Sequence, residues 1–269
     1  MNRYQEEYAQ KKMSAQQVLE NIHSNDFIFT PMAASCPDAL MGELQHLKDT
    51  NVENVILQTC IPTDYTAFHD PEMDKVLTHH GWFFSAGLRK ANAKHLVSAV
   101  PQHSTSILRK TLDRIRHEGR RPVLLTTVSP MDARGYMSLS VSSIYEMDVI
   151  RAGAVLLVEV NPNYPRTFGD TMVHISQVTA LVESNRNILC IDPAPYTEVD
   201  ATIGRYVASL VEDGYADDRR YAAAFAREKS SITGWGPVKI RMALAAKGIS
   251  REIADEALQE IDSERADAK

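Results

Sequence analysis

Two near-continuous apolar segments constrain the fold of this chain most strongly. Residues 122–128 read Pro-Val-Leu-Leu-Thr-Thr-Val, and residues 154–160 read Ala-Val-Leu-Leu-Val-Glu-Val. A strand with one face in solvent alternates apolar and polar side chains, whereas continuous runs of Val and Leu are typical of strands buried on both faces of a parallel sheet. We therefore expect both segments to be buried strands of such a sheet.

Shorter apolar runs predict two further strands with a helix between them. Residues 27–29 read Phe-Ile-Phe and residues 55–57 read Val-Ile-Leu, which indicates buried strands. Pro37 suits the first position of a helix, and Ser14 with Gln17 predicts a capping box at an earlier helix. Strand–helix–strand alternation implies parallel strands joined by crossover helices, so the predicted fold class is α/β with a mainly parallel sheet. The apolar residues at helical spacing behind Pro37 are Leu40, Met41, Leu44 and Leu47.

The pattern changes near residue 212. Residues 199–213 predict a helix with one apolar face, and Gly214 is a suitable residue to end it. Three short amphipathic helical patterns then follow one another without a strand between them. We therefore divide the chain into an α/β part, residues 1–212, and a short all-helical part, residues 213–269.

The helical part is expected to need support and to carry positive charge. Three short helices bury little apolar surface, so we expect them to pack against Val207 and Leu210. Between Arg219 and Arg251, eight Lys or Arg residues accompany one acid, Glu228, although the whole chain has 29 basic and 35 acidic residues. This asymmetry predicts a different partner for each part, or else a solvated helical face.

Cysteine usage and hydropathy place the protein in the cytoplasm. Cys36, Cys60 and Cys190 are isolated, which favours reduced thiols over a disulfide framework. The first residues contain no apolar secretory segment, and no apolar run approaches the about 20 residues that span a bilayer. We expect a cytoplasmic protein that makes no membrane contact.

Residues 158–170 carry the first family resemblance. They read Val-Glu-Val-Asn-Pro-Asn-Tyr-Pro-Arg-Thr-Phe-Gly-Asp, which resembles the N-P-x-x-P-R-T-x-G-D signature of the acetyl-CoA hydrolase and 4-hydroxybutyrate CoA-transferase family. Residues 128–139, Val-Ser-Pro-Met-Asp-Ala-Arg-Gly-Tyr-Met-Ser-Leu, are similar to its S-P-x-D-x-x-G-Y-x-S-L segment. Residues 4–8 and 198–205 also fit, in the family's order. The resemblance covers residues 1 to about 212 and implies the N-terminal half of a CoA-transferase.

The signature loop supplies the candidate substrate-side residues. A polar, proline-braced turn after a buried parallel strand lies at the carboxyl end of the sheet, where open α/β folds bind ligands. Arg166 offers a planar donor fork suited to carboxylate or phosphate, although it could instead pair with Asp170 in a rigid loop. The candidates for the side that faces substrate or coenzyme A are Ser129, Pro130, Asn161, Pro162, Asn163, Pro165, Arg166, Thr167, Gly169 and Asp170.

The same resemblance implies that the catalytic residue is missing. In this family the acyl group passes through a thioester on a glutamate of the second half, and no segment here matches it. We therefore expect no catalytic residue, no bound cofactor, an acyl-CoA and a small carboxylate as substrates once a complementing half is present, and self-association through the surface left uncovered. One departure is the Gly-rich turn that the family tends to have after its first strand, which here reads Met-Ala-Ala-Ser-Cys-Pro from Met32 to Pro37.

Two further residues admit a catalytic interpretation. Glu159 is a lone acid in an apolar strand, and buried acids of this kind are often functional. An acid paired with Arg166 or with a backbone donor is the favoured reading. Cys36 could have a lowered pKa at a helix N-terminus, but a small buried residue is the default.

A metal site is not expected. One run of His and Asp residues lacks the spacing of paired ligands on one helix face. We interpret it as a polar connecting segment. The run comprises His69, Asp70, Asp74, His79 and His80.

The helical part carries a second resemblance. Residues 214–222 read Gly-Tyr-Ala-Asp-Asp-Arg-Arg-Tyr-Ala, and residues 234–249 fit the pattern G-x-G-P-x-x-I-R-x-x-L-x-x-K-G-I. Both are similar to RecX, the regulator of the RecA recombinase, and the likeness covers residues of about 207–262. It implies binding to RecA, and the basic run is compatible with nucleic acid. The partner-binding candidates are Arg219, Arg220, Lys239, Arg241 and Lys247.

The two resemblances meet in one helix, so we interpret the chain as a chimera. Residues 207–214 fit either family. Three functions stay open at this point: a CoA-transferase half, a RecX-like binding module carried on that half, and a folded remnant without activity.

Overall fold

The computed structural model describes residues 2–101, 103 and 107–267. It divides into two compact units, Met1–Ile191 and Asp192–Lys269. The boundary that the sequence predicted near residue 212 falls inside the second unit, at the end of its first helix.

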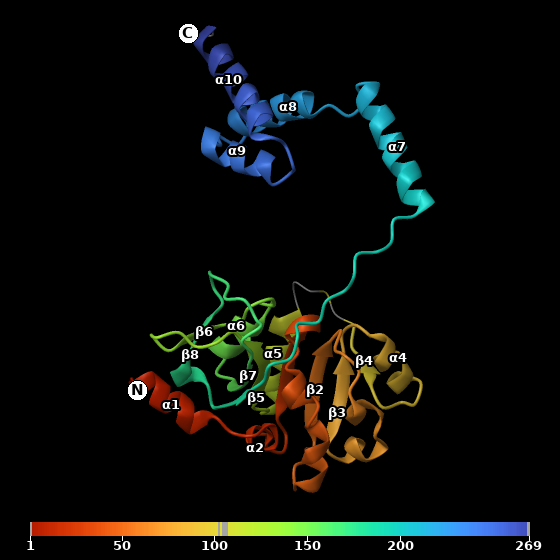
Figure 1. Ribbon diagram of the computed structural model, residues 1–269, viewed down its shortest axis with the longest axis vertical. Helices are drawn as coiled ribbons and strands as arrows, with labels where there is room; N and C mark the ends of the chain where they lie inside the picture. The colour runs from red at the N-terminus through yellow and green to blue at the C-terminus, as the bar shows by residue number, and fades with distance from the viewer. Residues whose placement is uncertain (1, 102, 104–106, 268–269) are drawn as a thin grey trace. The chain divides into compact units, whose positions relative to one another are not determined.

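The first unit is built on a seven-stranded parallel sheet, as predicted (Figure 1). The strand order is β4-β3-β2-β1-β5-β7-β9, so the chain moves outward from β1 in one direction and then returns to add β5 on the other side. Open α/β sheets bind ligands where the order reverses in this way, outside the carboxyl ends of the strands. The strands are β1 Phe27–Met32, β2 Val55–Cys60, β3 Leu77–Gly81, β4 Ser98–Ala99, β5 Pro122–Val128, β7 Val155–Val160 and β9 Ala180–Glu183.

The two long apolar segments are β5 and β7, and they pair with each other. Their side chains alternate between two apolar cores. Leu125 and Leu157 belong to one core, whereas Leu124 and Leu156 belong to the other. Because successive side chains of a strand point to opposite faces, the two cores lie on opposite faces of the sheet. Burial on both faces is the reason that these strands lack polar positions.

Helices cover both faces of the sheet. Buried residues of α2 (Ala15–Leu19), α3 (Asp38–Met41) and α4 (Ala86–Asn92) join the first core. Residues of α5 (Ile107–Glu118) and α6 (Glu146–Arg151) join the second.

Local signals for helix starts were mostly confirmed. The predicted capping box of Ser14 and Gln17 is present at α2. Pro37 is the N-cap of α3, and the expected helix behind it is divided into α3 and a 3-10 segment, Leu44–Asp49. Both pieces are buried through their apolar residues, which accounts for the helical spacing seen in the sequence.

Several elements of the first unit were not predicted. They include β3, β4 and β9, helix α1 (Arg3–Lys11), and an antiparallel ribbon of β6 (Tyr136–Ser138) and β8 (Met172–His174). His79 and His80 lie on β3, so the expectation of a polar connecting segment there is wrong. His79 is buried because this strand lies between β2 and β4.

The second unit is helical. Its helices are α7 (Glu198–Glu212), α8 (Asp218–Ser231), α9 (Pro237–Ala245) and α10 (Arg251–Asp267). The expected packing on Val207 and Leu210 is wrong, since these side chains are 52% and 45% exposed. The core is formed by α8, α9 and α10 themselves, where small residues such as Ala222 and Ala257 let α8 and α10 approach each other.

None of the helices in the part of the chain that the structure describes is long and apolar enough to cross a bilayer.

Candidate functional site

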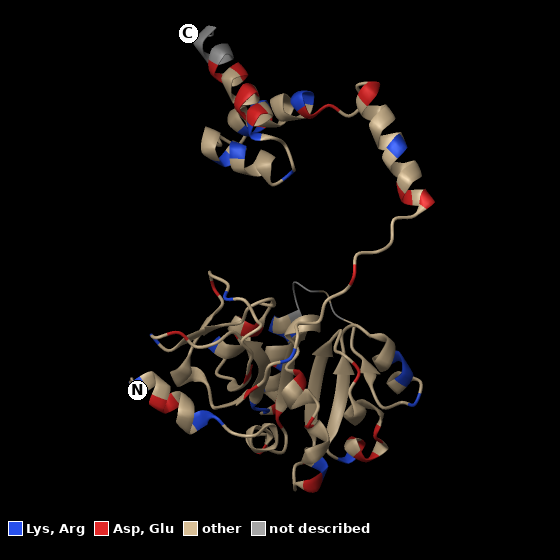
Figure 2. Cartoon of the chain, viewed as in Figure 1, with Lys and Arg blue, Asp and Glu red and all other residues tan. Residues whose placement is uncertain are grey.

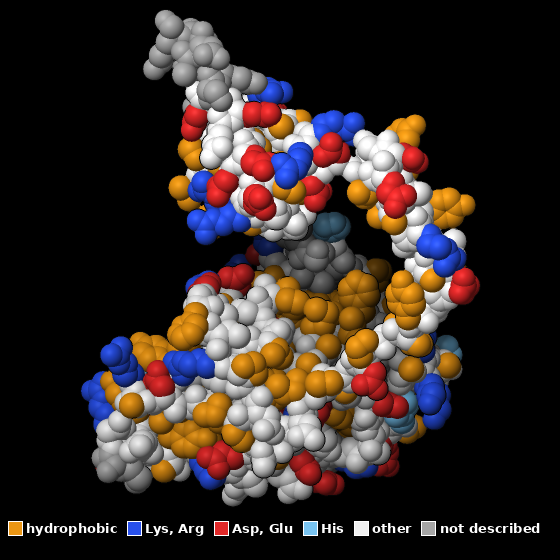
Figure 3. Space-filling view, turned by 45° about the horizontal axis from the view of Figure 1, so that its top comes forward, with side chains coloured by type: hydrophobic (Ala, Val, Ile, Leu, Met, Phe, Trp, Pro, Cys, Tyr) orange, Lys and Arg blue, Asp and Glu red, His pale blue; other side chains and the backbone are white. Residues whose placement is uncertain are grey.

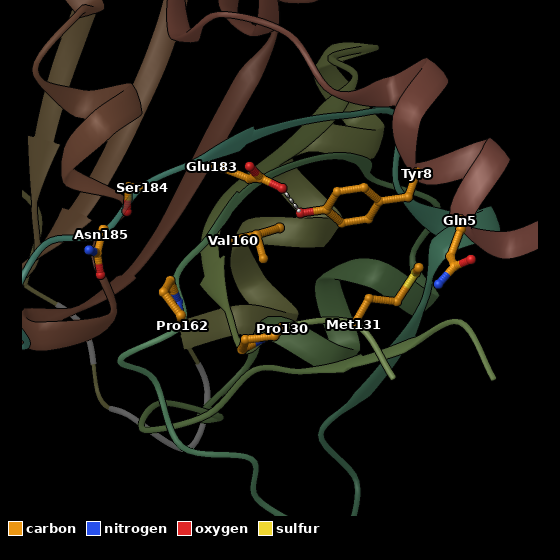
Figure 4. Close-up of a pocket in the computed structure, with 9 residues that line it drawn as sticks. All are labelled: Gln5, Tyr8, Pro130, Met131, Val160, Pro162, Glu183, Ser184 and Asn185. Carbon is orange, nitrogen blue, oxygen red and sulfur yellow. Dashed lines mark hydrogen bonds between the residues drawn. The ribbon is translucent and has the colours of Figure 1, made fainter. Parts of the chain in front are cut away.

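A cavity of about 680 Å³ opens at the carboxyl ends of β5, β7 and β9. Figure 4 shows its residues around a common space, with helix α1 forming one wall. Apolar and polar side chains both line it, as is usual for sites that bind small organic ligands. The apolar lining residues are Pro130, Met131, Val160 and Pro162, and the polar ones are Gln5, Tyr8, Glu183, Ser184 and Asn185.

One wall of the cavity is fixed by contacts between α1 and the edge strand β9. The Tyr8 hydroxyl donates to Glu183 Oε1 at 2.9 Å, and the Lys12 ammonium pairs with the other carboxylate oxygen. Burial, together with the neighbouring carboxylate, raises the pKa of Tyr8. The hydrogen bond from Lys12 holds the pKa of Glu183 below its ordinary value. Glu183 is therefore ionised at neutral pH and already has two partners.

The first half of the signature loop borders this cavity. Asn161 is fully buried, and its side chain donates to the Arg186 carbonyl at 3.0 Å. Its amide oxygen accepts from the Asn163 backbone N–H, and the Asn163 side chain donates to Asn185 Oδ1 at 3.1 Å. These two amides fix the loop, whereas Pro162 is the loop residue that lines the cavity.

The second half of the loop lies on the β6–β8 ribbon. Arg166 pairs with Asp132 at 2.7 Å and donates to the Tyr136 carbonyl at 3.1 Å. The alternative pair of Arg166 with Asp170 is therefore wrong, and Asp170 pairs with Arg151 instead. Arg166 braces the turn that precedes β6.

Hydroxyl groups connect the remaining predicted residues of the loop to the ribbon. The Thr167 backbone N–H donates to Ser138 Oγ at 3.1 Å, and the Pro165 carbonyl accepts from Ser140 Oγ at 2.6 Å. Gly169 has φ of +102°, which a side chain would strain.

Ser129, at the end of β5, is buried and accepts from the Ser138 backbone N–H at 3.0 Å. The structure thus brings Pro130 and Pro162 together at the cavity, while their predicted neighbours support the loop.

A buried ion pair that the sequence did not reveal lies beside the cavity. Glu159, at the carboxyl end of β7, accepts from Arg186 Nε at 2.9 Å and from the Ser184 hydroxyl. Its other oxygen accepts from the Ala39 backbone N–H at 2.8 Å. The expected backbone donor to Glu159 is confirmed, whereas the arginine that pairs with Glu159 is Arg186 and not Arg166. With both oxygens bonded and no exposed surface, Glu159 is a structural acid rather than a free nucleophile.

Arg186 follows β9 and connects it to the carboxyl end of β7 and to the segment that follows β1. Besides Glu159, its guanidinium pairs with Asp38 at 3.1 Å and donates to the Cys36 carbonyl at 2.6 Å. It also lies 5.2 Å from the centre of the Tyr164 ring. The sequence offered little signal for it, because Arg186 follows a strand, β9, that the apolar pattern did not identify.

The turn after β1 has the backbone shape of a glycine turn without the glycine. Ala33 has φ of +48°, and Ile61, which follows β2, has φ of +49°. This left-handed region is costly for residues with a β-carbon. The Tyr164 hydroxyl donates to the Ala34 carbonyl and so helps to hold the turn. Ala33 therefore adopts a left-handed conformation in the turn where the family tends to have glycines.

Two other candidates, Cys36 and His79, are buried, and the residues considered for a metal site do not come together. Burial raises the pKa of the Cys36 thiol to about 12, so the reading of Cys36 as a buried small residue is confirmed and the lowered pKa is wrong. Burial lowers the pKa of His79 to about 3, and its Nε2 lies 2.8 Å from the Thr59 hydroxyl. Among residues 2–101, 103 and 107–267, no three His, Cys, Asp or Glu side chains form a group that could hold a metal ion.

The surface of the first unit is rich in exposed hydrophobic residues. Figure 3 shows such side chains gathered on the face turned toward the viewer. Ile61 and Phe83 follow the neighbouring strands β2 and β3, and the Ile61 N–H donates to the Phe83 carbonyl at 3.3 Å. Contiguous apolar surface of this kind marks an interaction site. Among the side chains of the unit that the structure describes, the exposed large hydrophobic ones are Ile61, Phe83, Tyr136, Val141, Ile144, Phe168, Leu189 and Ile191.

In the second unit, the predicted partner-binding residues have different environments. Arg219 pairs with Glu256, and Arg241 pairs with Asp255 at 2.6 Å. Arg220 donates to the Tyr215 carbonyl at 3.0 Å. Lys239 and Lys247 instead lie over aromatic rings. The acids of α10 follow the basic run in sequence, so counting charges along that run overstated its free positive charge.

Comparison with known proteins agrees with the fold and with the loop sequence. Residues 1–193 match the model of the acetyl-CoA hydrolase/transferase N-terminal domain. The chain belongs to this family. It is 31% identical over 213 residues to succinyl-CoA:cyclohexane-1-carboxylate CoA transferase of Geobacter metallireducens, covering 78% of this chain and 47% of that protein. It is 28% identical over 215 residues to 4-hydroxybutyrate coenzyme A transferase of Clostridium kluyveri, covering 78% and 48%.

Solved structures share the fold of the first unit. RipA from Yersinia pestis superposes with a TM-score of 0.69 at 23% identity, over 78% of this chain and 50% of RipA. For 4-hydroxybutyrate CoA-transferase from Porphyromonas gingivalis the TM-score is 0.56 at 22% identity, over 77% of this chain and 47% of that one. The chain thus spans about half the length of the CoA transferases that it matches.

The second unit has relatives of its own. Residues 217–258 match the model of the second three-helix domain of RecX. Regulatory protein RecX of Escherichia fergusonii is 44% identical over 68 residues, covering 24% of this chain and 40% of that protein. Both resemblances drawn from the sequence are therefore confirmed.

Proposed function

We propose that the first unit is the N-terminal half of a coenzyme A transferase, which binds an acyl-CoA and a carboxylate together with a complementing half. The observation that supports this most directly is the cavity at the carboxyl ends of β5, β7 and β9 in a chain of this family. Its apolar and polar lining residues suit the acyl chain and the carboxylate of such substrates.

We also propose that this chain does not catalyse transfer by itself. Glu183 is the acid among the residues that line the cavity, and Tyr8 and Lys12 already occupy its oxygens. Glu159 has no exposed surface and accepts three hydrogen bonds. A nucleophilic carboxylate needs an oxygen that can reach the thioester carbon, and neither acid offers one.

The test is to incubate the purified chain with acetyl-CoA and a panel of carboxylates and to follow CoA exchange. We expect no turnover above background. Exchange that Glu159→Gln or Glu183→Gln abolishes, with the variant still folded, would show that a residue of this chain is the nucleophile and would contradict the proposal.

A second candidate function belongs to the helical unit. Because residues 217–258 match a RecX domain, we propose that this unit binds RecA through Lys239 and Lys247 rather than through Arg219 and Arg241. The arginines are engaged with acids of α10. Filament binding at low salt should fall for Lys239→Glu/Lys247→Glu. Equal binding by the parent and this variant would exclude the lysines from the contact.

A further inference from the structure

Lysines and aromatic rings alternate on one face of the helical unit. Lys239 Nζ lies 4.1 Å from the centre of the Trp235 ring. Lys229 Nζ lies 5.5 Å from the Phe225 ring and 5.7 Å from the Trp235 ring. These distances are within the range of cation–π contact.

A third lysine extends this face along α8. Lys247 Nζ lies 5.8 Å from the Phe225 ring and 5.9 Å from the Tyr221 ring, and the two rings stack with centres 5.9 Å apart. The resulting set, Tyr221, Phe225, Lys229, Trp235, Lys239 and Lys247, is called the lysine–aromatic face below.

The local structure holds this face in place. The Trp235 backbone N–H donates to the Lys229 carbonyl at 2.9 Å, so the segment before α9 is fixed to the end of α8. Pro237 then starts α9, which anchors itself in the core through Ile240. The rings are therefore held on a fixed platform: Tyr221 is 43% exposed, whereas Phe225 and Trp235 are partly buried and pack against the core of the unit.

Positive charge on this face is only partly neutralised. Figure 2 shows basic residues on α8 and α9 and acidic residues along α10. Arg219 and Arg241 pair with those acids, and Lys229 pairs with Glu228 at 2.7 Å. Within the residues that the structure describes, no carboxylate lies at ion-pair distance from Lys239 or Lys247. These two ammonium groups are available to an external anion.

We propose that single-stranded nucleic acid binds to the lysine–aromatic face. Lysines that follow a phosphate backbone, interleaved with rings on which unpaired bases stack, are the combination that single-strand binding uses. An acidic protein surface would use the lysines but would gain little from the rings. Paired bases of a duplex would not expose their faces for stacking. The proposal depends neither on CoA transfer nor on RecA.

Trp235 provides a direct readout of stacking. The chain has two tryptophans, and the other, Trp82, is buried with an indole N–H that has no hydrogen-bond partner. Trp82→Phe therefore removes no hydrogen bond and leaves Trp235 as the fluorescent reporter. The probe is an oligothymidylate of about 16 nucleotides, the upper range for a small single-strand site.

We expect the oligothymidylate to quench Trp235 fluorescence in the full chain at low salt. With Lys239 and Lys247 on phosphates and about 0.7 ions released for each, the logarithm of the binding constant should fall with the logarithm of salt concentration with a slope of about −1.4. Lys239→Glu/Lys247→Glu should weaken binding by about tenfold or more. The matched control is Lys90→Glu/Lys94→Glu, on α4 and just after it, which makes the same change of charge on exposed residues elsewhere and should leave binding within about twofold.

A second variant separates stacking from charge. Trp235→Leu, read by fluorescence anisotropy of a labelled oligonucleotide and checked for helicity by circular dichroism, should bind about fivefold or more weakly, since one stacked base accounts for at least that factor. Two results would overturn the proposal. One is the absence of oligothymidylate binding at low salt. The other is equal binding by heparin and by oligothymidylate with no loss in Trp235→Leu, which would indicate a surface for acidic polymers in general.

Discussion

At the scale of single residues, Ala33 is the clearest case of a position whose conformation does not suit its side chain. Its φ of +48° lies in the left-handed region, which costs a residue with a β-carbon about 1–2 kcal/mol. Glycine pays no such cost, although it loses about 0.5–1 kcal/mol more conformational entropy on folding. Ala33→Gly should therefore raise the free energy of unfolding by up to about 1 kcal/mol in a urea titration.

The control for this prediction is an alanine with ordinary backbone geometry. Ala91 lies inside α4 and is buried, so a change to glycine should lower the free energy of unfolding by about 2 kcal/mol, from helix propensity and the lost buried methyl group. If Ala33→Gly destabilised the protein as much as Ala91→Gly, the left-handed turn would not be strained.

A second prediction at this scale concerns acid sensitivity. Burial lowers the pKa of His79 to about 3, from an ordinary value near 6.5. Below about pH 6.5 the unfolded chain therefore binds a proton that the folded protein does not, and stability falls as the pH is lowered through this window. The slope for one such group is about 1.4 kcal/mol per pH unit. The free energy of unfolding should drop by about 2 kcal/mol between pH 6.5 and pH 5.

The corresponding variant is His79→Gln, which keeps a polar group near Thr59 but cannot titrate. It should flatten the slope between pH 6.5 and pH 5, although burial also lowers the pKa of His80 and leaves a residual slope. His117→Gln, an exposed position on α5, is the control for the same substitution at the surface. An identical pH profile in the parent and in His79→Gln would refute the assignment.

Residue types alone identified some of the site but not its pairings. The signature loop was placed correctly at the carboxyl edge of the sheet, and Pro130 and Pro162 line the cavity there. Arg166 and Arg186 are both close to that loop in sequence, and no spacing rule decides which of them pairs with Glu159. The answer depends on β9, since Glu159 is opposite Val182 in the parallel register.

At the scale of elements, the sequence predicted strands by apolar runs and missed those that are short or partly polar. The strands β5 and β7 are long and buried on both faces, so their pattern is unambiguous. The strand β3 reads Leu-Thr-His-His-Gly, and its burial comes from its neighbours in the sheet rather than from its own composition. Helix α7 illustrates the converse, because the helix itself was predicted correctly but none of its residues is buried.

The ribbon of β6 and β8 leads to a prediction about backbone and packing together. Gly135, before β6, has φ of +85°, and a β-carbon there would lie 2.7 Å from His174 Nε2. The His174 ring cannot move freely, because it makes edge contacts with Tyr4 and Tyr136. Gly135→Ala should therefore lower the free energy of unfolding by about 2–3 kcal/mol, the sum of the left-handed cost and the displaced ring.

Gly153 is the matched control for that substitution. It has nearly the same φ, +86°, but nothing lies within 4 Å of an added β-carbon. Gly153→Ala should cost the left-handed term less the extra conformational entropy that a glycine loses on folding, up to about 1 kcal/mol. Equal losses in the two variants, measured by urea unfolding, would show that the contact with His174 contributes nothing.

At the scale of the whole molecule, the chain exposes two apolar features that a stable monomer would be expected to cover. One is the set of exposed hydrophobic residues on the first unit, which includes Phe83 at 62% and Phe168 at 86% exposure. The other is the stripe on α7. Apolar residues there recur with spacings of four, three and four, as in the seam of a coiled coil. The residues of this stripe are Val199, Ile203, Tyr206 and Leu210, each 45–69% exposed.

We therefore expect the chain to self-associate at micromolar concentration, as its sequence also suggested. The α7 stripe can be tested separately from the surface of the first unit. Ile203→Glu/Leu210→Glu places two charges in the stripe, and charges in a desolvated seam oppose association. The measurement is sedimentation velocity across a concentration series, with Thr202→Glu/Ser209→Glu as a control that adds the same charge to α7 outside the stripe.

A shift toward monomer in the first variant but not in the control would assign association to α7. Association that persists equally in all three proteins would assign it to the first unit. A parent chain that sediments as a single monomeric species at micromolar concentration would refute self-association through either surface.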